Sequence, residues 1–141
     1  MFHKVLVAVD VSVAGPSPLG LDQAIELVAA SQGELRLVNV LSILPASFME
    51  YVPADFDEEQ EKKAVAALDA IIARLPLPAP RLSRVVRLGG VYHELLGEAT
   101  TWGADLIVVG SHRPVMSDYL LGSNAKTIVR HANCSVLVVR P

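Results

Sequence analysis

The sequence predicts an α/β fold: one doubly wound, five-stranded parallel sheet with helices on both faces, a Rossmann-like arrangement. Five short runs rich in Val, Ile and Leu alternate with four longer stretches that have helical spacing. The runs at residues 4–9, 106–109 and 135–139 are almost continuously apolar, which is typical of strands buried on both faces of a parallel sheet. With 141 residues, 52% of them hydrophobic and 19% charged, the chain has the size and composition of one folded domain, residues 1–141.

The first half of the chain supplies two strand–helix units. A strand at residues 4–9 is followed by a helix at residues 21–30, in which Leu21, Ala24 and Val28 share one face. A strand at residues 35–41 is followed by a helix at residues 57–75. This helix begins with several Asp and Glu residues, which suit the positive end of a helix dipole.

The second half supplies two more units and a last strand. A strand at residues 82–88 leads to a helix at residues 91–101, and a strand at 106–109 leads to a helix at 123–131. The fifth strand covers residues 135–139. Right-handed crossovers then predict the strand order 3-2-1-4-5, with a ligand crevice at the carboxyl ends of strands 1 and 4. The aperiodic segments 11–18 and 42–56 both follow strand ends, where loops commonly build sites.

The charge and composition exclude several classes of protein. A formal net charge of −3 gives no basic excess for non-specific nucleic-acid binding or for an anionic membrane surface. The longest apolar runs are far shorter than the ~20 residues that a membrane span needs, and the opening residues are too short for a signal peptide. A single cysteine, Cys134, forms no internal disulfide. We therefore expect a cytoplasmic protein without a membrane span.

Polar residues and glycines follow the two strands that flank the predicted crevice. Asp10 ends the first strand, Gly110 ends the fourth, and Arg113 comes shortly after it. Gly122 and Ser123 open the last helix, where free backbone N–H groups and the helix dipole favour an anion such as phosphate. Two plainer interpretations stay open: the Gly-Ser pair as an ordinary helix N-cap, and Asp10 as the cap of a turn. No pair of histidines has metal-ligand spacing, so we expect no metal site.

The C-terminal third resembles the universal stress protein family. The resemblance lies in residues 104–114, 119–125 and 130–140, and residues 5–10 (Val-Leu-Val-Ala-Val-Asp) are similar to that family's first strand. The nucleotide-binding branch of the family carries the pattern Gly-x2-Gly-x9-Gly-[Ser/Thr]. Gly110 and the pair Gly122-Ser123 match it, whereas Arg113 stands at the second glycine and the following spacer is eight residues. The altered Ser-His-Arg-Pro loop resembles a subgroup whose members also bind ATP or AMP.

The resemblance implies a ligand, a set of contacts and an assembly. The ligand is ATP or AMP, with or without Mg²⁺. Ala8, Val9 and Asp10 would line the adenosine, with Asp10 on the ribose, and the backbone of Val40 would meet the adenine. The ribose and phosphates would meet Gly110, Arg113, Gly122, Ser123 and Asn124. The fifth strand would pair with its counterpart in a second subunit, giving a homodimer or a tetramer built from dimers, and an apolar edge at residues 136–139 suits that role.

We therefore expect an ATP- or AMP-binding universal stress protein that acts as a nucleotide-dependent regulatory module in stress response, with no catalytic residues. The alternative is a weak ATPase or phosphotransferase using the same site, although the sequence has no Gly-x4-Gly-Lys-[Ser/Thr] loop to hold phosphates and magnesium. A phosphoacceptor receiver domain is set aside. It would need an acceptor Asp after the third strand, where this chain has Gly89 and Gly90.

Overall fold

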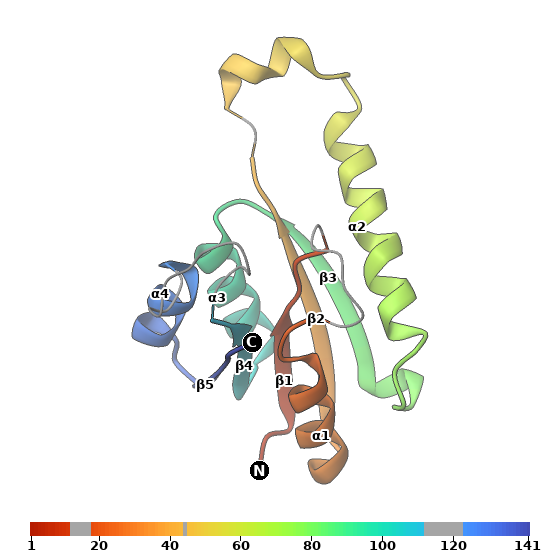
Figure 1. The fold of residues 1–141 in the computed structure, drawn as a ribbon, viewed down its shortest axis with the longest axis vertical. Helices are drawn as coiled ribbons and strands as arrows, with labels where there is room; N and C mark the ends of the chain where they lie inside the picture. Colours follow the sequence, from red (N-terminus) through yellow and green to blue (C-terminus); the bar gives the residue numbers. More distant parts are fainter. Residues whose placement is uncertain (12–17, 44, 112–122) are drawn as a thin grey trace.

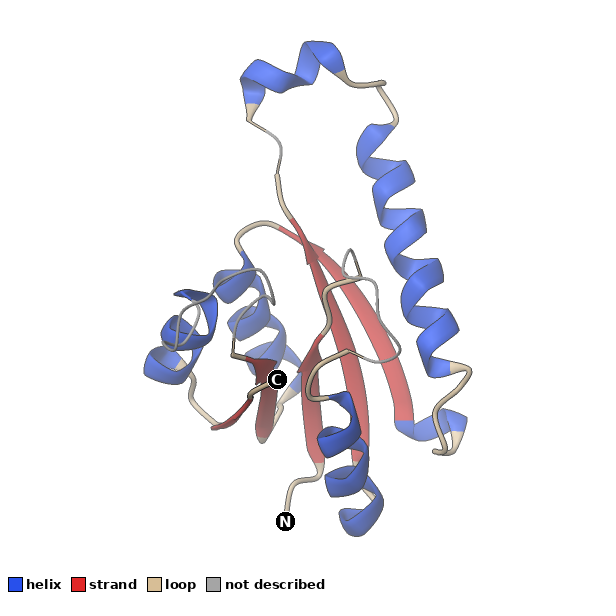
Figure 2. Cartoon of the chain, in the orientation of Figure 1, coloured by secondary structure: helices blue, strands red, loops and turns tan. Residues whose placement is uncertain are grey.

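The computed structural model describes residues 1–11, 18–43, 45–111 and 123–141 (Figures 1 and 2). The strands are β1 (Lys4–Ala8), β2 (Glu34–Leu41), β3 (Leu82–Leu88), β4 (Leu106–Gly110) and β5 (Ser135–Val139). The helices are α1 (Leu21–Ser31), α2 (Phe56–Ile72), α3 (Val91–Trp102) and α4 (Ser123–His131), with two 3₁₀ helices, η1 (Ala46–Tyr51) and η2 (Ala79–Arg81). None of the helices among these residues is long and apolar enough to cross a membrane.

The sheet confirms the predicted topology. Its five strands run in the order β3-β2-β1-β4-β5, and every neighbouring pair is parallel. In the centre, Val7 of β1 lies opposite Leu37 of β2 on one side and Val108 of β4 on the other. All the strands therefore end at one edge of the sheet, which we call the carboxyl edge, and begin at the opposite, amino edge.

Alternate residues of the central strands fill two separate cores. Val5 and Val7 of β1 face α1 and α2, where they pack with Val28 and Leu68. Leu6, which lies between them, faces α3 and α4 and packs with residues such as Leu95 and Ile128. The central strands are buried on both faces because a helix layer covers each one, as in other parallel sheets.

Several element boundaries differ from the prediction. α2 ends at Ile72 rather than at residue 75, because the chain tightens into turns in which Arg74 N donates to Ile71 O and Leu75 N to Ile72 O. Pro76 follows, and a residue before proline disfavours the α conformation. η1 occupies part of the predicted loop at 42–56. β5 is only half-buried, since it lies at the edge of the sheet; the expectation that it is buried on both faces is wrong.

The amino edge is closed by hydrogen bonds between distant parts of the chain. The carboxylate of Asp105 accepts the backbone N–H of His3 at 2.8 Å and of Lys4 at 3.0 Å. Arg81 donates to the carbonyl of Gly33 at 2.7 Å and to that of Val28 at 2.8 Å. Gly33 also packs directly on the backbone, because a Cβ placed there would lie 2.6 Å from His3 O. These contacts fix the beginnings of β1, β2, β3 and β4 to one another.

Candidate functional site

The predicted crevice lies where β1 and β4 end side by side at the carboxyl edge. β1 stops at Ala8 and β4 at Gly110, and the two strands pair directly through Val7 and Val108. The helix that follows β1, α1, lies on one face of the sheet, and the helix that follows β4, α4, lies on the other (Figure 1). In open α/β sheets, ligands commonly bind at the strand ends where the connections change direction in this way.

Two glycines allow backbone segments to approach each other at this edge. A Cβ at Gly110 would lie 2.9 Å from the Leu19 side chain, so the chain entering α1 packs directly over the end of β4. Gly20, the N-cap of α1, has φ +94°, and a Cβ there would lie 2.8 Å from Val108 Cγ1. Such a positive φ favours glycine. Gly110 was predicted from its position at the end of the fourth strand and in the glycine pattern. No sequence motif pointed to Leu19 or Gly20.

The structure brings four of the predicted contact residues to this edge. Ala8 ends β1, and Val9 continues the ladder by donating its N–H to Val38 O at 2.8 Å. Asp10 follows them and is exposed. Val40, near the end of the neighbouring strand β2, is half-buried.

The phosphate side of the predicted site is described only in part. Gly110 ends β4, as predicted. Ser123 begins α4, and Asn124 is exposed in its first turn. Arg113 and Gly122 lie outside the described residues.

A buried asparagine at the same edge was not predicted. Asn39 of β2 is only 4% exposed, and its Oδ1 is 3.5 Å from the backbone N–H of Val11, just beyond Asp10. Its Nδ2 is buried and has no hydrogen-bond partner among the residues that the structure describes. A buried donor without a partner is a net cost to stability. The sequence signal was a polar residue within an apolar strand, between Val38 and Val40.

Two arginines, one on β2 and one on β3, have their charge neutralised by glutamates of α3. Arg87 of β3, which lies opposite Val40, donates to Glu94 and to Glu98 of α3, each at 3.0 Å. Arg36 donates to the other oxygen of Glu98 at 2.8 Å. The hydrogen bond to Glu94, and then that to Glu98, raise the pKa of Arg87 against an opposing effect of burial. These guanidinium groups are already engaged, so they are poor candidates for binding phosphate.

The described residues offer little for metal or redox chemistry. No group of three His, Cys, Asp or Glu side chains comes together among them as metal ligands. Burial, and after it the negative charge of Asp105, raises the pKa of the Cys134 thiol. A raised pKa lowers the thiolate fraction, so the thiol is a weak nucleophile.

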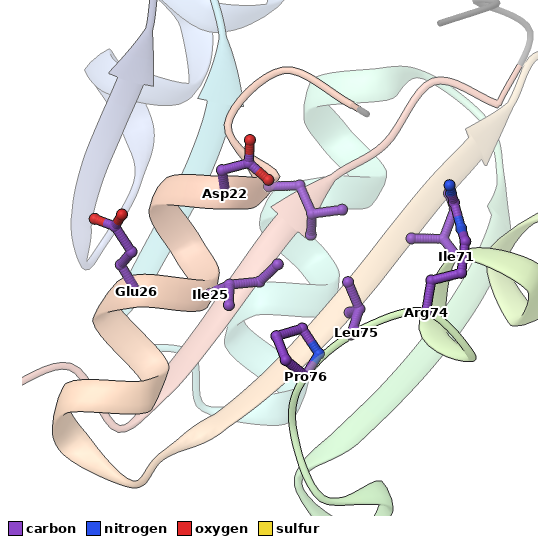
Figure 3. A pocket seen from close by; sticks show the side chains of 8 residues that line it. Asp22, Ile25, Glu26, Ile71, Arg74, Leu75 and Pro76 are labelled. Carbon is purple, nitrogen blue, oxygen red and sulfur yellow. The ribbon is translucent and has the colours of Figure 1, made fainter. Parts of the chain in front are cut away.

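A separate open groove of about 520 Å³ lies between α1 and the end of α2. Asp22 and Glu26 of α1 stand on one side, and Arg74, Leu75 and Pro76 on the other (Figure 3). None of the predicted nucleotide contacts lines it. The groove is therefore distinct from the predicted nucleotide site.

Comparison with known proteins places the chain in a family. The model of the universal stress protein family matches residues 1–140. The chain belongs to the universal stress protein family. It is 34% identical to universal stress protein G of Shigella flexneri over 143 residues, covering 99% of this chain and 100% of that relative.

Solved structures of other universal stress proteins share the fold. Universal stress protein UspA from Lactobacillus plantarum has a TM-score of 0.73 and 23% identity, covering 98% of this chain and 97% of its own. A universal stress protein solved in complex with cAMP has a TM-score of 0.62 and 24% identity, covering 98% and 96%. At these identities the likeness is one of fold.

Proposed function

We propose that this universal stress protein binds an adenine nucleotide, ATP or AMP, at the carboxyl edge and acts as a nucleotide-dependent regulatory module in stress response. The observation that carries the proposal is the meeting of the ends of β1 and β4, where Gly110 leaves the backbone without a side chain. Family membership supports it, and so does the complex of one structural relative with cAMP, which is itself an adenine nucleotide.

The proposal assigns a part of the ligand to each residue. Ala8 and Val9 would line the adenosine, Asp10 would accept hydrogen bonds from the ribose, and the backbone of Val40 would meet the adenine. The ribose and phosphates would be held by Gly110, Arg113, Gly122, Ser123 and Asn124. The N-terminus of α4 would supply backbone N–H groups and a favourable dipole for the phosphates. Such local donors are needed because the whole chain is acidic.

Titration calorimetry with ATP, AMP and cAMP, each with and without Mg²⁺, tests the binding. Ser123→Asp places a negative charge at the start of α4, and we expect it to lower nucleotide affinity about tenfold or more by repelling phosphate. Asp is itself a good residue at a helix start, so the variant should stay folded. His93→Asp adds the same charge to the first turn of α3 and should leave the affinity unchanged.

Two results would contradict the proposal. The first is no detectable binding at millimolar concentrations of any of the three nucleotides. The second is an equal affinity of the wild type and Ser123→Asp, which would remove the N-terminus of α4 from the phosphate site. Steady phosphate release that Ser123→Asp abolishes would instead favour the weak ATPase.

We also propose that the protein is a cytoplasmic homodimer paired through β5. This strand is at the edge of the sheet, and Val136, Leu137, Val138 and Val139 are all half-buried. Ser111 N donates to Val139 O, so Val139 faces β4 and, by the alternation of a strand, Val138 directs its N–H outward. Val138→Pro removes that outward donor. Sedimentation should then show weaker self-association than that of the wild type, and unchanged self-association would contradict pairing through this edge.

A further inference from the structure

One segment of the chain stands apart from both cores. Residues 45–61, here called the arm, comprise η1, the connection after it and the start of α2. They extend beyond the carboxyl edge at the top of the molecule (Figure 1). No residue of the arm is buried, and the first buried residue of α2 is Ala64. The arm is therefore held by the chain at its two ends and contributes nothing to the core.

The arm exposes large apolar side chains that packing would normally cover. Phe48 is 54% exposed, Met49 51% and Tyr51 80%. All three come from the six residues of η1. Single exposed apolar residues are common on protein surfaces, but a cluster of them on one projecting element indicates an interaction site. Aromatic residues and methionine are also enriched in the buried centres of protein interfaces.

The same arm concentrates negative charge. It holds six of the fifteen acidic residues and none of the twelve basic ones. The rest of the chain consequently carries nine acidic and twelve basic residues. A partner for the arm must therefore offer positive charge together with some apolar surface.

The outer face of α4 offers both. Lys126 and Arg130 are exposed four residues apart, and Val129 between them is 48% exposed. Residues at this spacing share one side of a helix. Neither cation forms an ion pair within the described part of the chain. The aliphatic stems of Lys126 and Arg130 extend the apolar surface around Val129.

We propose that the arm of one copy docks on the α4 face, Lys126, Val129 and Arg130, of a second copy. Figure 1 shows the arm and α4 in separate parts of one molecule, with the arm at the far end of its long axis. Because the arm and α4 lie apart in one molecule, these two complementary surfaces would meet between two copies. Phe48 and Tyr51 would cover Val129, while carboxylates such as Glu50 and Glu58 pair with the two cations. This contact is separate from β5 pairing and does not depend on bound nucleotide.

Zero-length cross-linking tests the contact directly. A carbodiimide joins a lysine amine to a carboxylate that touches it, so the expected product links Lys126 to a carboxylate of the arm. The experiment uses an equal mixture of ¹⁴N- and ¹⁵N-labelled full-length protein. Linked peptides of mixed isotope then identify a contact between two copies. Such links should decrease at high salt, because salt screens exposed charges.

Charge reversal gives a second, independent measurement. We expect Glu50→Lys/Glu58→Lys on the arm and Lys126→Glu/Arg130→Glu on α4 each to weaken self-association about tenfold in sedimentation, because like charges would then meet. Combining the two sets should restore an affinity within about threefold of the wild type, since opposite charges face each other again. Glu26→Lys/Glu34→Lys changes the net charge equally at exposed positions outside the arm and should have no effect.

The cross-linking and sedimentation results each either support or overturn the contact between the arm and α4. Mixed-isotope links between Lys126 and the arm, together with restoration in the combined variant, support the contact. It is overturned if these links are absent while the protein is self-associated. It is also overturned if the arm variant associates as strongly as the wild type, or if the combined variant does not recover. The same cross-linking experiment is repeated with Val138→Pro protein, which tests the arm contact separately from β5 pairing. The links between Lys126 and the arm should persist in this variant.

Discussion

The two edges of the sheet are built in different ways. At the amino edge, Asp105 and Arg81 close on backbone groups of neighbouring elements with bonds of 2.7–3.0 Å. At the carboxyl edge, the buried amide donor of Asn39 has no partner in the described part of the chain, and Gly110 has no side chain. The polar groups at the amino edge therefore stabilise the fold. The carboxyl edge carries features that cost stability, as binding sites commonly do.

The largest expected effect is on the free energy of unfolding, when one glycine at each edge is replaced by alanine. Gly33→Ala at the amino edge would drive a methyl group into the backbone of His3, which has no rotamer to change. We expect it to lower the free energy of unfolding by about 3 kcal/mol, as overpacking does. Gly110→Ala meets only the flexible Leu19 side chain, so about 1 kcal/mol or less is expected there. Urea denaturation of both variants measures the difference.

The same two glycine variants should also differ in nucleotide affinity. Gly110→Ala should lower nucleotide affinity, because its methyl group would displace the Leu19 side chain at the edge where the ligand is proposed to bind. Gly33→Ala should leave the affinity of the folded protein unchanged. Equal losses of stability in the two variants, or equal losses of affinity, would remove the distinction between the edges.

A smaller effect is expected at Asp105. Asp105→Ala removes a charged acceptor from two backbone N–H groups, and we expect a loss of about 2 kcal/mol in the free energy of unfolding. Asp105→Asn retains one acceptor oxygen and should lose less. Thermal or urea unfolding checks both variants, and calorimetry should find nucleotide affinity unchanged. A variant that lost affinity while remaining folded would show that the amino edge also serves the ligand.

The smallest effect is expected at Asn39. Asn39→Leu has a similar volume and removes the unpartnered amide, so the free energy of unfolding should rise or stay within about 1 kcal/mol. Asn39→Asp is the matched control. It places a carboxylate at the same buried position, so it should be clearly less stable than Asn39→Leu at neutral pH. A marked loss in Asn39→Leu would indicate that the amide has a stabilising partner after all.

Regular patterns account for what could be predicted of the fold. The apolar runs gave β3 and β5 at their observed bounds, and the other strands within one residue. The alternation of strands and helices gave the strand order, because right-handed crossovers leave few arrangements. The end of α2 was missed, since Leu75 continues its apolar periodicity although the helix has already tightened into turns before Pro76.

The positions of some candidate site residues were predictable from where the strands end. Asp10 and Gly110 follow strands that had to end at the same edge. Asn39 was not singled out, because its importance lies in the absence of a partner for Nδ2, which only the packing around it determines. Leu19 and Gly20 were missed for a similar reason: their contacts are with residues of β4, about ninety positions along the chain.

By itself, then, the sequence determined the fold class, the strand order and the edge at which all the strands end, because these follow from local periodicity and chain connectivity. Only the tertiary structure decided which polar groups are satisfied. It pairs Arg36 and Arg87 with Glu98 and closes Asp105 on the start of β1. It also leaves the Asn39 amide without a partner and the arm outside both cores. Whether a polar group has a partner and whether a side chain is exposed depend on which distant residues meet. No local sequence pattern encodes that.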